Sequence, residues 1–294
     1  MPQHPLFSVL IANYNNGKYL QEAIDSVLAQ TYTNWEIIIV DDGSSDQSQE
    51  IYEQLKLNRR IHIYMNDTNR GCGFSKRLCV DKANGEICGF LDADDVLLSD
   101  ALQNHVIAHA NHHEASCIFS RYYCCDDNLN ILYEQRQLTI PEGESYFTHR
   151  DYDPEHFTSF KRSRYILTEG ISPDIPAGVD QDLYFKLEET GPVFILDKFT
   201  YKYRIYTGYQ RSLGDRGINA FYWNLIVRHN TCLRRNLNPQ LYTVLDLKDY
   251  IGAIQYCLDT SENQIQQIKK SRAYRLGNLL TRPLHIFRKI MSNQ

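Results

Sequence analysis

The feature that most constrains the fold is a regular alternation of apolar runs and helical patterns over the first 125 residues. Four apolar runs, each followed by polar or turn-forming residues, occupy residues 7–12, 37–40, 61–64 and 87–91. Between the first two runs, Leu20, Ile24 and Val27 recur at the spacing of one helix face. Continuous apolar runs are typical of strands buried on both faces, and strands that alternate with helices form parallel sheets. The pattern therefore predicts an α/β fold in which helices cover a mainly parallel sheet.

Acidic clusters follow two of these apolar runs directly. Asp41 and Asp42 end the second run, and Asp92, Asp94 and Asp95 follow the fourth. Ligands of parallel sheets bind beyond the carboxyl ends of the strands, so these carboxylates are predicted to line one rim. Carboxylate oxygens suit Mg²⁺ or Mn²⁺, which proteins usually hold with one or two carboxylates together with substrate phosphates. A solvated acidic turn that caps the next helix is the alternative interpretation of the second cluster.

Three segments together resemble the family-2 glycosyltransferases. They are FSVLIANYN from residue 7, IIIVDDGSSD from residue 37, and NRGCGFSKRLCVDKANGEICGFLDADD from residue 69. The resemblance covers roughly residues 6–210. It implies a GT-A (Rossmann-like) fold, a nucleotide-diphospho-sugar donor, a divalent metal and inversion at the anomeric carbon.

The resemblance assigns contacts with the nucleoside to residues at the ends of the first two predicted strands. Ala12 and Tyr14 fall where the family contacts the nucleoside, and Ala12 replaces the commoner Thr. Asp42, with Asp41 beside it, matches the acid that accepts a hydrogen bond from the pyrimidine N3–H. Uracil can donate that proton and cytosine cannot, which favours a UDP-sugar or a dTDP-sugar as the donor.

The resemblance also assigns residues to the diphosphate and the metal. Arg77, between Lys76 and Leu78, matches a basic residue near the ribose or the diphosphate. Asp92 and Asp94 match the D-x-D pair, in which Asp94 contacts the metal (Mn²⁺ or Mg²⁺) and Asp92 contacts the ribose or the metal shell.

The second half of the chain is expected to supply the general base. Its segment GVDQDL begins at residue 178 and resembles the family's G-E-D-x-D-L, with Val179 in place of Glu. Asp180 falls on the base position at the start of a predicted helix, where a carboxylate stays ionised easily. A helix N-cap is the alternative for Asp180. Tyr206 stands where the family has a histidine that completes the metal shell, and tyrosine is a poor ligand for these ions.

A helical region is predicted over residues 211–294, beyond a catalytic domain at residues 1–210. After Glu262 the chain has no acidic residue, and seven Lys and Arg lie among apolar residues at helical spacing. Such a basic amphipathic segment, residues 269–291, suits either an anionic membrane surface or docking on the domain or a partner. Residues 207–217 contain three glycines and are interpreted as a lid over the diphosphate or as a polar loop.

Charge and cysteine content narrow the class of protein. The 31 basic and 36 acidic residues give a net charge of −5, which argues against nucleic-acid binding. The sequence lacks a run of roughly 18 apolar residues, so no membrane-spanning helix is expected. Its first residues, MPQHPLFSVLIANYNN, show no basic n-region followed by a cleavable apolar segment, so no secretory signal is expected. Eight scattered cysteines without a C-x-x-C pair predict free thiols rather than disulfides or zinc. The expected location is the cytoplasm, either free or peripherally on the cytoplasmic face of the membrane, and the oligomeric state is not indicated.

Four histidines at near-helical spacing follow the second acidic cluster. They are His105, His109, His112 and His113. A His-x-x-x-His pair on a helix can bind zinc, but the Glu of the usual zinc motif is absent here. We therefore predict that these histidines belong to a solvated polar helix face.

The sequence as a whole predicts a metal-dependent glycosyltransferase that acts on a hydroxyl of a glycan or lipid-linked acceptor, in polysaccharide or cell-surface glycan synthesis. A sugar nucleotidyltransferase would share the sheet and the metal acids. It would need a Gly-rich basic loop after the first strand, whereas residues 13–18 hold one Gly and no Arg. A non-catalytic membrane-surface assembly partner is the other alternative, and Val179 and Tyr206 favour it.

Overall fold

The computed structural model describes residues 4–136, 139–149, 156–205, 215–243, 251–252 and 255. The chain divides into two compact units, one of residues 1–210 with 223–243 and one of residues 211–222 with 244–294. The predicted division at residue 210 stays a prediction, because the first unit also takes in residues 223–243. Tyr206, residues 207–214 of the predicted lid and the basic segment 269–291 lie outside the described residues. None of the described helices is long and apolar enough to cross a membrane.

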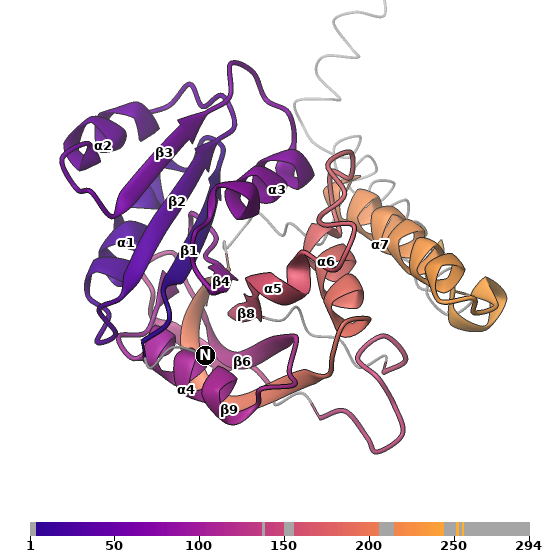
Figure 1. Cartoon of the computed structure of the whole chain (residues 1–294). Coiled ribbons are helices and arrows are strands. Elements are labelled where there is room, and N and C mark those ends of the chain that lie inside the picture. The colour runs from indigo at the N-terminus through magenta and orange to yellow at the C-terminus, as the bar shows by residue number, and fades with distance from the viewer. Residues whose placement is uncertain are drawn as a thin grey trace, which may run out of the picture. The chain divides into compact units, whose positions relative to one another are not determined.

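The first half of the sheet is parallel, as the alternating pattern predicts. Its strands are β1 (Phe7–Asn13), β2 (Trp35–Asp41), β3 (Ile61–Met65) and β4 (Ile87–Phe90). They lie in the order β3-β2-β1-β4. The helices that connect them are α1 (Gly17–Leu28), α2 (Ser48–Leu55) and α3 (Cys72–Lys82). Figure 1 shows α1 and α2 on one side of these strands and α3 on the other.

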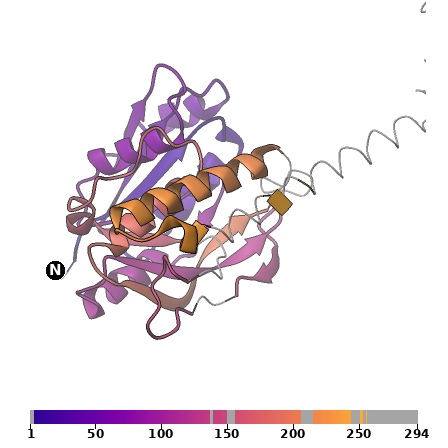
Figure 2. The same cartoon turned by 90° about the vertical axis from the view of Figure 1, so that its right-hand side faces the viewer.

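The second half of the sheet mixes strand directions. Its strands are β5 (Val96–Leu97), β6 (Cys117–Cys125), β7 (Ile131–Glu134), β8 (Thr158–Lys161) and β9 (Val193–Arg204). The order continues β4-β8-β6-β9-β5, and β8 runs antiparallel to both β4 and β6. The helices of this half are α4 (Ala101–Asn111), α5 (Arg162–Tyr165), α6 (Val179–Glu188) and α7 (Asp215–Arg234). The sheet can be followed from the indigo to the orange strands (Figures 1 and 2).

The core lies on both faces of the sheet, because alternate residues of a strand point to opposite sides. Val9 and Ile11 of β1 pack in one apolar cluster with Leu20 of α1. Leu10 packs in the other cluster with Cys79 of α3. These five side chains are fully buried, so the central strand is rigidly positioned and its carboxyl end is a fixed platform.

The prediction of a solvated histidine face is wrong for the two histidines of α4. His105 and His109 are fully buried against the sheet, whereas His112 is half-buried and His113 exposed just after the helix. The His105 ring contacts Ser159 Oγ at 2.7 Å and Ser120 Oγ at 3.0 Å, and His109 Nε2 lies 2.9 Å from Ser159 Oγ. Serine hydroxyls of β6 and β8 thus meet both ring nitrogens of His105 and Nε2 of His109, whereas His109 Nδ1 is buried without a partner among the described residues. Sequence spacing alone did not show that strands would present hydroxyls to this helix.

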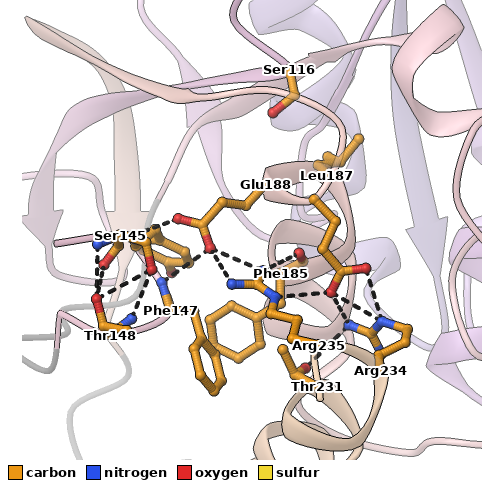
Figure 3. Close-up of polar contacts among 12 residues, drawn as sticks. Ser116, Ser145, Phe147, Thr148, Phe185, Leu187, Glu188, Thr231, Arg234 and Arg235 are labelled. Atoms are coloured by element: carbon orange, nitrogen blue, oxygen red, sulfur yellow. Dashed lines mark hydrogen bonds and ion pairs between the residues drawn. The ribbon is translucent and has the colours of Figure 1, made fainter. Parts of the chain in front are cut away.

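The carboxyl end of α6 is tied to two other segments. Glu188 accepts hydrogen bonds from the backbone N–H groups of Tyr146, at 2.5 Å, and Phe147, at 3.2 Å. Its other partner is Arg235, at 3.0 Å, and this guanidinium also donates to the carbonyl of Phe185 at 2.6 Å. Figure 3 shows Glu188 between the 145–148 segment and Arg235. We call these contacts the Glu188–Arg235 tether. They hold the carboxyl end of α6, the helix that carries the predicted base in its first turn.

Candidate functional site

The ends of β1 and β2 are joined by a buried polar network. Asn13 and Asp41 are register partners, and Asn13 Nδ2 lies 3.0 Å from Asp41 Oδ2. The Tyr52 hydroxyl donates to the same oxygen at 2.6 Å, and the Ser44 N–H donates to Oδ1 at 2.8 Å. The Asp41 carboxylate is fully buried, so it holds the turn after β2 in place. Its predicted contact with a nucleotide stays a prediction.

Asp42 fixes the loop that leads from β3 to α3. Its carboxylate accepts hydrogen bonds from Asn66 Nδ2 and from the backbone N–H groups of Arg70 and Gly71, each at 2.8 Å. Gly71 has a φ of +94°, a backbone conformation that residues other than glycine rarely adopt. Asp42 therefore places the amino end of α3 beside the rim. Its role as the acceptor for a base stays a prediction.

Lys76 of α3 joins the two halves of the predicted site. Its ammonium Nζ lies 2.6 Å from Asp180 Oδ1 and 3.5 Å from Asp92 Oδ1. Lys76 is only 6% exposed. Burial lowers the pKa of Lys76, but the carboxylates of Asp180 and Asp92 outweigh it and hold the pKa well above its ordinary value. We call Lys76, Asp92 and Asp180 the Lys76 cluster.

Arg77, the predicted basic contact, points away from the Lys76 cluster. The Arg77 guanidinium donates to the carbonyls of Glu169, at 3.2 Å, and Ile171, at 2.9 Å, so it tethers the loop before α6. Successive residues point about 100° apart around a helix, so Lys76 and Arg77 cannot face the same site. The sequence contains Lys76 but no local signal that selects it over Arg77. A donor contact by Arg77 stays a prediction.

Cys72 lies one helical turn before Lys76, and charged groups from both ends of the rim act on its thiol. The side chain is exposed, yet protein surrounds the thiol closely, and this partial burial raises its pKa to about 11. Lys76 opposes the rise, whereas the charges of Asp180, Asp92 and Asp42 add to it. The three acids that were predicted to bind the donor and the acceptor therefore act on one thiol.

The turn that carries the D-x-D pair is anchored to β9 through Asp95, the acid that follows the pair. Asp95 accepts hydrogen bonds from the Tyr201 hydroxyl at 2.9 Å and from the Arg204 N–H at 2.7 Å. The Arg204 guanidinium donates to the Asp94 carbonyl at 2.5 Å. Burial, followed by the charges of Asp94 and Asp92, raises the pKa of Asp95 well above its ordinary value. Because Asp94 and Asp95 are buried, a solvated acidic turn is not what forms here.

Asp180 stands in the first turn of α6, with its side chain 40% exposed. The N-cap is Gly178 at a φ of +70°, so the alternative of Asp180 as the N-cap is wrong. Asp182 is buried and pairs with Lys186 at 2.8 Å, which anchors the helix from within. Val179, which replaces the family's Glu, is buried in the core. The Asp180 carboxylate is therefore available beside Lys76 on a firmly held helix.

The chemistry of the D-x-D acids fits a divalent ion only in part. Asp92 has a 34% exposed side chain and Asp94 a buried one, and both offer the hard oxygen ligands that Mg²⁺ and Mn²⁺ prefer. Across the described part of the chain, no three His, Cys, Asp or Glu side chains gather closely enough to hold a metal ion. Two carboxylates with diphosphate oxygens and water form the usual Mg²⁺ arrangement. The residues thus fit a metal that arrives with a phosphorylated ligand.

The two predicted nucleoside contacts lie at the carboxyl end of β1. Ala12 is the register partner of Val40 and packs partly against the core. Tyr14 is 47% exposed just beyond the strand, so its ring is accessible to a flat ligand. Both contacts stay predictions.

Comparison with known sequences identifies the family. The sequence model described as "Glycosyl transferase family 2" matches residues 8–167. Chondroitin synthase of Escherichia coli is 30% identical over 205 residues, which make up 67% of this chain and 28% of that protein. Hyaluronan synthase of Pasteurella multocida is 28% identical over 259 residues, or 84% of this chain and 24% of that protein. The chain spans about a quarter of the length of these two relatives.

Solved structures share the fold. The structure of S. aureus TarS 1–349 in complex with UDP has a TM-score of 0.61 at 18% identity, and the match covers 80% of this chain and 68% of that one. The mannosyltransferase PcManGT of Pyrobaculum calidifontis in complex with GDP-Man and Mn²⁺ has a TM-score of 0.58 at 14% identity. The match covers 95% of this chain and 84% of that one. Because the family match extends over more than half of the sequence and the sheet is that of GT-A structures, this chain belongs to glycosyltransferase family 2.

Proposed function

We propose that the chain transfers a sugar from a nucleotide-diphospho-sugar to a hydroxyl of a glycan or lipid-linked acceptor in polysaccharide synthesis. The observation that carries the proposal is the Lys76 cluster, in which one ammonium lies 2.6 Å from Asp180 and 3.5 Å from Asp92. An acid suited to the donor and an acid suited to proton transfer thus share a site. Support for a polysaccharide product comes from the names of the chondroitin and hyaluronan synthases that resemble this chain.

Asp180 is the proposed general base. Its exposed carboxylate takes the proton of the acceptor hydroxyl while the hydroxyl oxygen attacks the anomeric carbon. The bond between that carbon and the diphosphate oxygen breaks, and the nucleoside diphosphate leaves with the bonding electrons. A single displacement of this kind inverts the anomeric configuration. Asp180 stands in the first turn of α6, beside the backbone N–H groups that begin the helix.

The donor is proposed to bind along the rim from Tyr14 to Asp94. Lys76 is buried beside Asp92 and supplies fixed positive charge where the diphosphate is expected. A divalent ion bound by Asp92 and Asp94 would neutralise further charge on the leaving diphosphate. A UDP-sugar is favoured, because Asp42 suits uracil and TarS binds UDP and UDP-GlcNAc in its structures. GDP-Man, bound by PcManGT, is the competing donor class.

Calorimetry and a donor panel test the proposal. We expect UDP to bind more tightly with Mn²⁺ than without it, and Asp94→Ala to abolish that difference. Incubation with UDP-GlcNAc, UDP-glucuronate, UDP-glucose and GDP-mannose should release nucleoside diphosphate from at least one donor. Binding without release from any donor, with acceptor oligosaccharides present, would favour the assembly-partner alternative. Absence of nucleotide binding would contradict the proposal outright.

A further inference from the structure

His156 lies immediately before β8 and has its ring orientation set by three tyrosines. The imidazole stacks on Tyr203 with ring centroids 4.7 Å apart and planes at 11°, and on Tyr201 at 5.5 Å and 12°. Tyr122 meets it edge-on at 5.3 Å and 80°. Tyr122 comes from β6 and the other two rings from β9, so rigid strands hold the imidazole plane.

The same imidazole lies beside the charged groups of the site. Burial lowers the pKa of His156, and the charges of Asp92, Asp180 and Asp94 act on the ring in the opposite direction. Lys76 also acts on it and lowers the pKa. Tyr201, on which the imidazole stacks, accepts a hydrogen bond from the Asp92 N–H at 3.2 Å and donates one to Asp95 at 2.9 Å, so His156 lies beside the turn that carries the D-x-D pair.

The contacts of His156 differ in kind from those of the buried His105. Among the described residues, the His156 ring stacks on tyrosines and feels nearby charges, and it forms no hydrogen bond. His105, by contrast, has serine hydroxyls on both ring nitrogens. An imidazole offers one N–H donor and one acceptor. His156 is half-buried and no described residue hydrogen-bonds its ring, so both nitrogens are open to a ligand in the site.

We propose that His156 is a specificity-determining residue that hydrogen-bonds a hydroxyl of the sugar carried by the donor. This inference rests on the proposed glycosyl transfer. A hydroxyl both donates and accepts hydrogen bonds, which matches the two ring nitrogens. The position next to Asp92 selects the donor sugar rather than the nucleotide base, which is expected at the other end of the rim beside Tyr14 and Asp42.

Two variants separate hydrogen bonding from stacking. His156→Phe keeps a ring against Tyr203 and removes both nitrogens, whereas His156→Gln keeps a donor near the position of Nε2. We expect His156→Phe to bind UDP as the wild type does and to bind the preferred UDP-sugar about tenfold more weakly, as loss of one hydrogen bond predicts. His156→Gln should restore part of the loss, and His156→Phe should narrow the preference among donor sugars.

A matched control comes from a histidine outside the site. His112 stacks on Phe194 with centroids 3.5 Å apart, and His112→Phe should change neither affinity. Equal weakening of UDP and UDP-sugar binding by His156→Phe would mean that His156 is structural and would overturn the proposal. An effect confined to the KM of the acceptor would move the contact to the acceptor and would also overturn it. If the wild type releases sugar from no donor, the proposed function itself fails, which is a separate result.

Discussion

Neighbouring residues of one helix have different tasks in this protein. Lys76 pairs with Asp180 and Asp92, whereas Arg77 holds two backbone carbonyls of the loop before α6. The two side chains have similar charge, so composition cannot tell them apart. Their directions differ because of the helix geometry, and the sheet beneath α3 decides which of them faces the rim. Functional assignment at this scale depends on orientation more than on residue type.

Lys76→Met is expected to weaken donor binding about tenfold, or roughly 1.4 kcal/mol, because a charge-assisted contact with the diphosphate is lost. The Asp180 and Asp92 carboxylates also lose the cation between them. Lys76→Arg should retain part of the affinity. Calorimetry with the preferred UDP-sugar measures the effect, and Arg77→Met is the control that should leave affinity unchanged. The reverse ranking of Lys76 and Arg77 would contradict the assignment.

Asp180→Asn is expected to bind the donor normally and to lose at least about 100-fold in kcat, the usual contribution of a general base. The amide still fits beside Lys76 but cannot take a proton from the acceptor. Initial rates with donor and acceptor at saturation, together with donor affinity, separate the two effects. Unchanged turnover would show that another group accepts the proton.

At the scale of elements, α4 and α6 show how the scaffold supports the site. The inner face of α4 carries two histidines, and serine hydroxyls of β6 and β8 contact three of their four ring nitrogens. α6 has the proposed base, Asp180, at one end and the Glu188–Arg235 tether at the other. Both elements combine apolar packing with a few buried polar contacts whose loss would leave groups unsatisfied. Substitutions that remove these buried polar contacts are therefore expected to lower the free energy of unfolding rather than to change the chemical step.

Acidification should destabilise the protein through α4. Burial lowers the pKa of His105 to about 3, and burial with the charges of His105 and Lys161 lowers that of His109 well below its ordinary value. The unfolded chain binds protons at these histidines below about pH 6.5, while the folded chain does not. Stability is therefore complete above that pH and falls as the pH drops toward 3. At pH 5 the cost for His105 should be about 2 kcal/mol, and His109 should add to it.

Urea unfolding at pH 7.5 and pH 5 measures this loss. His105→Asn should be less stable at pH 7.5 but should show a smaller difference between the two pH values, because one titrating group is gone. Equal stability of the wild type at both pH values would show that α4 opens to water in the folded state.

Glu188→Ala should lower the free energy of unfolding by about 3 kcal/mol, because two backbone N–H groups and Arg235 lose a charged partner. The matched control is Glu53→Ala, which removes an ion pair with Lys56 whose two side chains are 67% and 62% exposed. That change should cost less than about 0.5 kcal/mol. Chemical denaturation of the two variants compares them directly, and losses of equal size would mean that the tether contributes no more than a surface pair.

At the scale of the whole molecule, the site draws on segments from both halves of the sheet. Asp42 follows β2, Lys76 lies on α3 and Asp92 follows β4, whereas Asp180 arrives with α6 from the second half. The strand order β4-β8-β6-β9 inserts an antiparallel strand from late in the chain next to the parallel part. That insertion brings His156 to the acids, although more than sixty residues separate it from Asp92.

The sequence by itself determined the class of the protein and the local placement of its acids. Apolar runs and helical spacing predicted the parallel strands, and the family motifs predicted the GT-A fold, because both signals are local and repeat along the chain. Tertiary structure alone decided that Lys76 rather than Arg77 meets Asp180, that the α4 histidines are buried, and that His156 stands beside Asp92. Each of these depends on which distant strand packs next to a helix face, and no period or motif within a short window contains that information.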